Sequence, residues 1–134
     1  MGRVGDAELR RLYATCDVFV LPAVVDRKGD TEGLGVVLLE ALRFGRPVVA
    51  SDLGGIPDIV KPGRSGWLVP AGDSAALAGT LSQLAAHPEE ARRIGETGRE
   101  FAGERFSWSH LIHELGTCYE EAQSIREQKR TREI

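Results

Sequence analysis

Two carboxylates and two glycines lie close together in one stretch of the chain. Glu32 and Glu40 are separated by seven residues, and Gly33 and Gly35 stand between them. Glycine lets the backbone turn sharply and come close to a ligand. If a helix begins just after the second glycine, its first amides have no partner inside the helix and suit a phosphate. Because carboxylates accept hydrogen bonds from hydroxyl groups, the stretch is suited to a sugar nucleotide.

The residues that follow this glycine pair have the period of a helix. Leu38, Leu39 and Leu42 fall on one stripe, whereas Glu40 points about 150° away from that stripe on the helical wheel. We therefore predict a helix whose apolar stripe faces the core and whose glutamate does not. The amides that lie free at its start are those of Gly35, Val36 and Val37.

Two carboxylates can also indicate other chemistry. A glycosidase places an acid and a nucleophile on opposite sides of the bond that it cleaves, and either glutamate taken alone could be an exposed surface residue. A loop carboxylate and a helix carboxylate beside a glycine-rich turn fit the binding of a sugar nucleotide better than either alternative. No Ser/His/Asp set and no metal-ligand spacing emerges from the sequence, so we predict no metal.

Short apolar runs alternate with helical patterns along the chain. Runs at residues 18–21, 48–50 and 67–69 predict buried strands, and Pro22 closes the first of them. Asp6 is a candidate N-cap of a helix whose apolar face comprises Leu9, Leu12 and Tyr13. Strands that alternate with helices in this way predict an α/β fold, a Rossmann-like parallel sheet flanked by helices.

Turn and cap residues indicate where the other helices begin and end. Gly45 and Pro47 are expected to end the central helix. The glycine-rich turn at residues 51–55 leads into a short helix and is predicted to expose further backbone amides. Asp73 or Ser74 is expected to cap a later helix with an apolar stripe.

Length and composition limit the classes of function. The 134 residues suffice for one domain but are few for an enzyme that handles two large substrates. We expect this domain at residues 1–122 and a polar C-terminal tail at residues 123–134. The net charge of −3, without a basic stripe, argues against nucleic acid as a partner. No apolar run approaches the ~20 residues of a membrane span, and the two cysteines have no disulfide pattern.

Several motifs occur in a definite order along most of the chain. In sequence they are Asp17-Val18-Phe19-Val20-Leu21-Pro22, the pair Glu32 and Glu40, Gly45-Arg46-Pro47-Val48-Val49-Ala50-Ser51, Gly54-Gly55-Ile56-Pro57-Asp58-Ile59-Val60, Gly66-Trp67-Leu68-Val69-Pro70 and Arg105-Phe106-Ser107-Trp108. From about Gly2 to Tyr119, this ordered set resembles the donor-binding, carboxyl-terminal domain of the retaining "group one" glycosyltransferases, which have the GT-B fold.

The resemblance implies a role for each residue of the central stretch. Glu32 contacts the hydroxyls of the donor sugar and is the catalytic candidate, while Glu40 binds the ribose diol. The family retains the anomeric configuration through front-face attack assisted by the leaving diphosphate, so no covalent nucleophile, no cofactor and no metal are expected. Arg3 and Val4 are lesser candidates for contact with the nucleobase. The residues that line the diphosphate are Gly33, Leu34, Gly35, Val36 and Val37.

The resemblance also implies missing parts. Family members pair two Rossmann-like domains and bind the acceptor in the amino-terminal one. This sequence has no counterpart of that domain, nor of the first donor-domain strands, which carry an Arg and a Lys for the diphosphate. We therefore expect the donor half of a retaining glycosyltransferase, inactive alone, whether as a natural short protein, a mis-started reading frame or a deliberately shortened chain.

Two other hypotheses for the function stay open, and the resemblance also indicates what the chain could pair with. One is a non-catalytic nucleotide-sugar-binding or scaffold module that acts with a partner subunit. The other, less favoured, is half of a GT-B-like sugar-nucleotide epimerase, a group that does not share this motif order. The strand from Val18 to Leu21 should have an open edge, so we expect self-association there or pairing with an amino-terminal type of subunit. We expect a cytoplasmic protein whose membrane contact is at most peripheral.

Overall fold

The computed structural model describes residues 4–26, 28–29 and 35–132, with side chains described as far as residue 126. The chain divides into two compact units, Met1–Ala102 and Gly103–Ile134. The first unit contains the sheet, and the second contains a long helix. That helix, α6 (Trp108–Arg132), continues through residue 123 without interruption. The predicted division into residues 1–122 and 123–134 stays a prediction.

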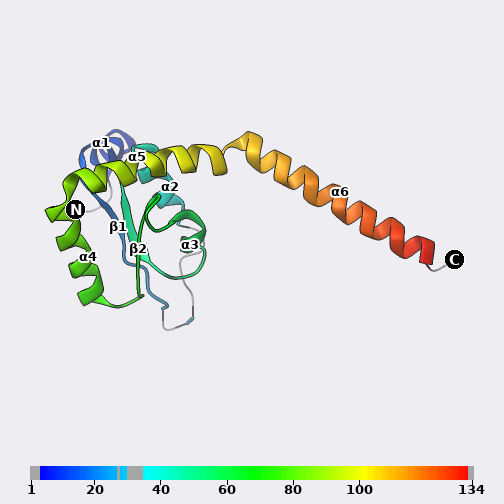
Figure 1. Ribbon diagram of the computed structural model, residues 1–134, viewed down its shortest axis with the longest axis horizontal. Coiled ribbons are helices and arrows are strands. Elements are labelled where there is room, and N and C mark those ends of the chain that lie inside the picture. Colours follow the sequence, from blue (N-terminus) through cyan, green and yellow to red (C-terminus); the bar gives the residue numbers. More distant parts are fainter. Residues whose placement is uncertain (1–3, 27, 30–34, 133–134) are drawn as a thin grey trace. The chain divides into compact units, whose positions relative to one another are not determined.

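In the described part of the first unit, three short strands form a parallel sheet. They are β1 (Phe19–Leu21), β2 (Val48–Ser51) and β3 (Gly66–Val69), and they lie in the order β1-β2-β3. Phe19 lies opposite Val48 in the register, and Val49 lies opposite Trp67. Figure 1 shows β1 and β2 running side by side. The predicted α/β class with a parallel sheet is confirmed.

Among the described residues, five helices accompany the sheet. Their bounds are α1 (Asp6–Thr15), α2 (Val36–Arg43), α3 (Ile56–Ile59), α4 (Ser74–Ala86) and α5 (Pro88–Arg105). Asp73 caps α4 as predicted, because its side chain accepts a hydrogen bond of 2.8 Å from the amide of Ala76. The prediction for α1 was wrong by one residue. Gly5 is its N-cap, and Asp6 lies in the first turn, where a carboxylate is favourable to the helix dipole.

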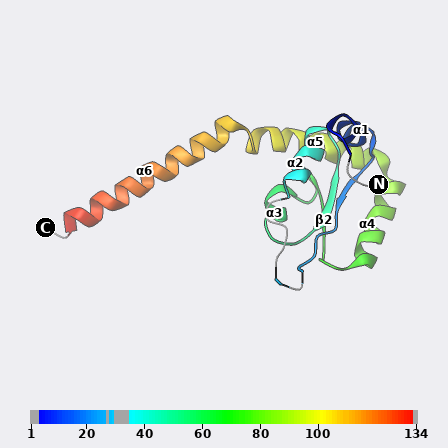
Figure 2. The same ribbon diagram turned by 180° about the vertical axis from the view of Figure 1, so that it is seen from behind.

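The two faces of the sheet are covered by different helices. Helix α2 contacts β1 and β2, and α4 contacts β2 and β3. Val49 belongs to a buried cluster that includes Leu84 of α4 and Val69 of β3. Val48 and Ala50 are also fully buried, and their side chains alternate to the opposite face. Figure 2, the view from behind, shows α2 beside β2.

The strand β1 lies at an edge of the sheet. All four residues of β2 are buried, whereas the three residues of β1 are only half-buried. The prediction that this strand is buried on both faces was therefore wrong in degree. The cause is its position, because within residues 4–26, 28–29 and 35–132 no strand pairs with its outer side. In the described part of the chain, the outer row of backbone groups therefore has no strand partner, as expected for an edge strand.

Helix α5 packs against the rest of the first unit through glycine. A Cβ atom at Gly95 would collide with the carbonyl oxygen of Gly45 and lie 2.9 Å from Cδ of Pro47. A Cβ atom at Gly98 would lie 2.7 Å from Cδ2 of Leu42. The backbone of α5 therefore lies directly against the end of α2 and the turn that leads into β2.

An ion pair joins the end of α5 to α6 in the second unit. Nη1 of Arg105 lies 2.6 Å from Oε2 of Glu114, and this hydrogen bond keeps the pKa of Glu114 below its usual value. Several apolar side chains of α6 are exposed: Trp108, Leu111, Ile112, Leu115, Tyr119 and Ile125. Even so, no helix in the described part of the chain combines the length and the apolar character that a membrane span requires.

Candidate functional site

Gly35 shapes the start of α2. Its backbone is left-handed, with φ +71° and ψ 52°, and its carbonyl accepts a hydrogen bond of 2.8 Å from the amide of Leu38. A Cβ atom here would lie 3.0 Å from Cδ1 of Leu38 and 3.4 Å from Cδ2 of Leu21. Both the angle and the space therefore call for glycine. The predicted turn into the helix is confirmed at this residue.

The first turn of α2 has no side-chain cap. Val36 and Val37 lie in this turn, and no residue of the described ranges accepts a hydrogen bond from either amide. Their side chains are exposed, while Leu38 and Leu42 are completely buried. Because Gly35 lies close to the end of β1, this turn is at the carboxyl edge of the parallel strands, where open α/β sheets bind ligands.

Glu40 lies on the exposed side of α2, as predicted. Its Oε2 atom accepts a hydrogen bond of 2.8 Å from the hydroxyl group of Tyr13 in α1. The tyrosine ring is buried and stacks on Phe44, with 5.7 Å between the ring centroids, and it lies 5.5 Å from the ring of Phe19. Burial and the bond to Glu40 raise the pKa of Tyr13 to about 12, so the hydroxyl remains a donor at neutral pH.

A pocket of about 520 Å³ lies beside this hydrogen bond. Side chains of α1 and α2 form its wall, together with the ring of Phe44, which follows α2. Most of these residues carry a polar or charged group. They are Asp6, Leu9, Arg10, Tyr13, Glu40, Arg43 and Phe44. The pocket therefore offers both carboxylate and guanidinium groups, which suits a polar ligand.

A smaller pocket of about 220 Å³ lies where the strands end. Pro22 follows β1, Ser51 ends β2 and Pro70 follows β3, and all three contribute to its wall. In the neighbouring glycine-rich turn, two backbone amides already donate to carbonyls of the turn itself. The amide of Ile56 donates to the carbonyl of Leu53, and that of Asp58 donates to the carbonyl of Gly55, both at 3.1 Å.

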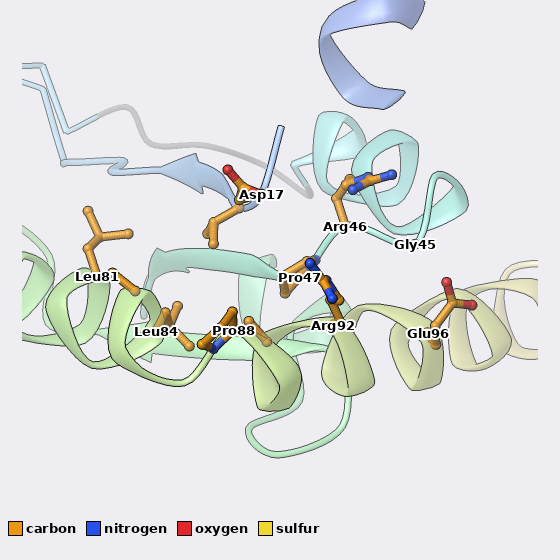
Figure 3. Close-up of a pocket in the computed structure, with 12 residues that line it drawn as sticks. Asp17, Gly45, Arg46, Pro47, Leu81, Leu84, Pro88, Arg92 and Glu96 are labelled. Carbon is orange, nitrogen blue, oxygen red and sulfur yellow. The ribbon is translucent and has the colours of Figure 1, made fainter. Parts of the chain in front are cut away.

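A third pocket, of about 690 Å³, lies at the opposite edge of the sheet. Asp17 and Pro47, which precede β1 and β2, line it together with Leu84 of α4 and Arg92 of α5 (Figure 3). The amino ends of parallel strands are remote from the turn at Gly35, so this pocket does not belong to the candidate site. Arg46 borders it and donates a hydrogen bond of 3.1 Å to the carbonyl of Cys16.

Several predicted site residues have no described position. Glu32, Gly33, Leu34 and Arg3 lie outside the described residues. Val4 is half-buried just ahead of α1, and it is not among the residues that line the pocket beside Glu40. No group of three His, Cys, Asp or Glu side chains within the described ranges could hold a metal ion; the absence of a metal in function stays a prediction.

Sequence reasoning did not assign Tyr13, Arg10 or Arg43 to this site. Tyr13 was assigned only to the apolar face of its helix, because its ring fits the helical period there. Its hydroxyl group was the available signal, since a buried tyrosine usually places its hydroxyl against a polar partner. The structure brings Tyr13 and Glu40 together although they are 27 residues apart.

Comparison with known proteins gives matches over most of the chain. The family model described as "Glycosyl transferases group 1" matches residues 1–101. An alpha-maltose-1-phosphate synthase from Mycolicibacterium smegmatis is 41% identical over 118 residues, which cover 84% of this chain and 29% of that protein. The chain thus spans less than a third of the length of this relative.

Two solved structures share the fold. A sucrose-phosphate synthase from Thermosynechococcus elongatus matches with a TM-score of 0.73 and 31% identity, covering 93% of this chain and 30% of that one. HepE from Anabaena, solved in complex with UDP and glucose, matches with a TM-score of 0.66 and 25% identity, covering 82% of this chain and 28% of that one. The chain belongs to the glycosyl transferases group 1 family.

Proposed function

We propose that this chain is the donor half of a retaining glycosyltransferase, which binds a nucleotide-diphosphate sugar for transfer of its glycosyl group to an acceptor. The observation that carries the proposal is the exposed face of α2. Its first turn has amides at Val36 and Val37 without a described acceptor, and Glu40 opens onto a polar pocket beside the same helix. The complex of HepE with UDP and glucose supports a ligand of this class.

Each part of the ligand has a proposed contact. The diphosphate binds the amides of Val36 and Val37 at the positive end of the helix dipole. Glu40 lies four residues further along the helix, about 6 Å at 1.5 Å per residue, and accepts hydrogen bonds from the ribose diol. Arg10 and Arg43 add positive charge to the wall of the same pocket.

The proposed chemistry requires little of the protein beyond binding and orientation. Glu32 orients the donor sugar through its hydroxyls, and the leaving diphosphate assists attack on the same face of the sugar. A helix start that stabilises negative charge on the diphosphate favours its departure, because the fixed amide dipoles already point at the developing charge. We propose no metal and no other cofactor.

Calorimetry with UDP, GDP and ADP tests the proposal on the 134-residue chain. We expect one of the three to bind with a Kd below about 1 mM, which corresponds to about 4 kcal/mol. The nucleoside of the same base, which lacks the diphosphate, should bind more weakly. If circular dichroism shows a folded chain and none of the three nucleotides binds, the donor-site proposal is wrong.

The open edge of β1 favours a second candidate function, a binding or scaffold module that acts with a partner. The strand is half-buried, and in the described ranges no other strand pairs with its outer side. We propose that an amino-terminal type of subunit or a second copy of the chain pairs there. If a second copy pairs there, size-exclusion chromatography of the chain alone should show an apparent mass that rises with protein concentration. A stable monomer at the highest concentration reached would argue against self-association.

A further inference from the structure

We infer that Tyr13 is a positioning residue for Glu40. Its hydroxyl group holds the carboxylate so that the remaining acceptor positions face both hydroxyls of a ribose, which gives the site its preference for ribonucleotides over 2′-deoxyribonucleotides. The inference rests on the proposed role of Glu40 in binding ribose. It adds a second residue, from another helix, that acts through Glu40 and determines which ligand fits.

The geometry holds the tyrosine firmly. Its ring is 6% exposed, and it stacks on Phe44 with an interplanar angle of 17°. On another side, its centroid lies 5.5 Å from the ring centroid of Phe19 in β1. The ring is therefore fixed by aromatic contacts from the end of α2 and from the sheet. A hydroxyl group on such a ring is a donor at a defined place.

Glu40, by contrast, has an exposed side chain on the surface of α2. Within the described structure, its one hydrogen bond to a side chain is the 2.8 Å bond from Tyr13 to Oε2. Arg43 follows three residues later on the same helix and lines the same pocket, a spacing at which opposite charges attract. Without the tyrosine hydroxyl, the carboxylate is free to turn toward that guanidinium and away from a ligand.

The acceptor capacity of the carboxylate fits this role. An ionised carboxylate offers about four lone-pair positions, and Tyr13 uses one of those on Oε2. The others suffice for the two neighbouring hydroxyls of a ribose. Because a site built to bind a hydroxyl discriminates strongly against a ligand that lacks it, the orientation of Glu40 determines how well ribose and deoxyribose are distinguished.

The substitution Tyr13→Phe tests the inference, because it removes the hydroxyl and keeps the ring. Affinities are measured for the tightest binder among UDP, GDP and ADP and for its 2′-deoxy form. We expect the wild-type chain to prefer the ribonucleotide by about tenfold. In Tyr13→Phe the ribonucleotide should bind about fivefold more weakly, while the deoxynucleotide changes less than about twofold. The preference for the ribonucleotide over the deoxynucleotide should therefore fall from about tenfold to about two- to fourfold.

Two further variants separate positioning from packing. Tyr119→Phe removes the hydroxyl of the other tyrosine, which is exposed on α6, and should leave both affinities unchanged. In a Glu40→Ala background, Tyr13→Phe should have no further effect on either nucleotide. A folded Tyr13→Phe chain that loses affinity for both nucleotides by the same factor would show a structural role and overturn the inference.

The outcomes also distinguish this inference from the proposed function. If the wild-type preference for ribose is lost in Glu40→Ala but intact in Tyr13→Phe, Glu40 binds ribose and only the positioning role is wrong. If the wild-type chain binds none of the nucleotides, or binds ribose and deoxyribose forms equally, the proposed role of Glu40 fails and the inference fails with it.

Discussion

Replacing Gly95 with alanine is expected to lower the free energy of unfolding by about 3 kcal/mol. The added Cβ would meet the carbonyl oxygen of Gly45 and Cδ of Pro47. Neither group can rotate away as a flexible side chain could, so α5 itself must move. The gain in helix propensity of about 1 kcal/mol is smaller than this cost. Urea unfolding followed by circular dichroism measures the difference.

Gly79→Ala is the matched control for this experiment. Gly79 is also in the interior of a helix, α4, and a Cβ atom there would have no neighbour within 4 Å. The same substitution should therefore stabilise the chain by about 0.5–1 kcal/mol through helix propensity. Equal effects of the two substitutions would contradict the close contact between α5 and the turn at Gly45.

Glu40→Ala is expected to weaken nucleotide binding by about 1–3 kcal/mol, the range for loss of hydrogen bonds to a charged group. At 1.4 kcal/mol per tenfold, this corresponds to a rise in Kd of about 5-fold to 150-fold. The physical reason is that the ribose hydroxyls, removed from water on binding, would lose their acceptor. Calorimetry with the best-binding nucleotide measures the change.

Glu100→Ala provides a control for the loss of charge. Glu100 is another exposed glutamate within a helix of the first unit, and it does not line the pocket beside Glu40. Its replacement should change the Kd less than twofold, because an exposed charge at a distance is largely screened by salt. An unchanged affinity in a folded Glu40→Ala chain would exclude ribose binding by this carboxylate.

Local chemistry explains which features could be predicted from the sequence. The bounds of α2 followed from glycine at both ends, and Gly35 and Gly45 both have a positive φ, +71° and +67°. The cap of α4 followed from an aspartate in the right place. The core strand β2 followed from an unbroken apolar run, as parallel strands buried on both faces require. Each of these signals acts within a few residues of the chain.

Features that depend on tertiary contacts could not be predicted in the same way. The bond between Tyr13 and Glu40 joins two helices, and a hydrophobic period treats tyrosine as apolar. The half-burial of β1 depends on what lies beside the strand. The residue types of the strand do not determine this. The hydrogen bonds from the amides of Ile56 and Asp58 to the carbonyls of Leu53 and Gly55 depend on backbone geometry that the residue types do not specify.

The short length of α2 has a consequence for how the site responds to distant changes. The helix has eight residues, about 12 Å at 1.5 Å per residue. Its amino end presents the proposed phosphate amides, and its carboxyl end leads into Gly45, which touches Gly95 of α5. In so short a helix, we expect a shift at one end to displace the other. Nucleotide affinity should therefore also depend on how Gly45 and α5 pack at the carboxyl end of α2.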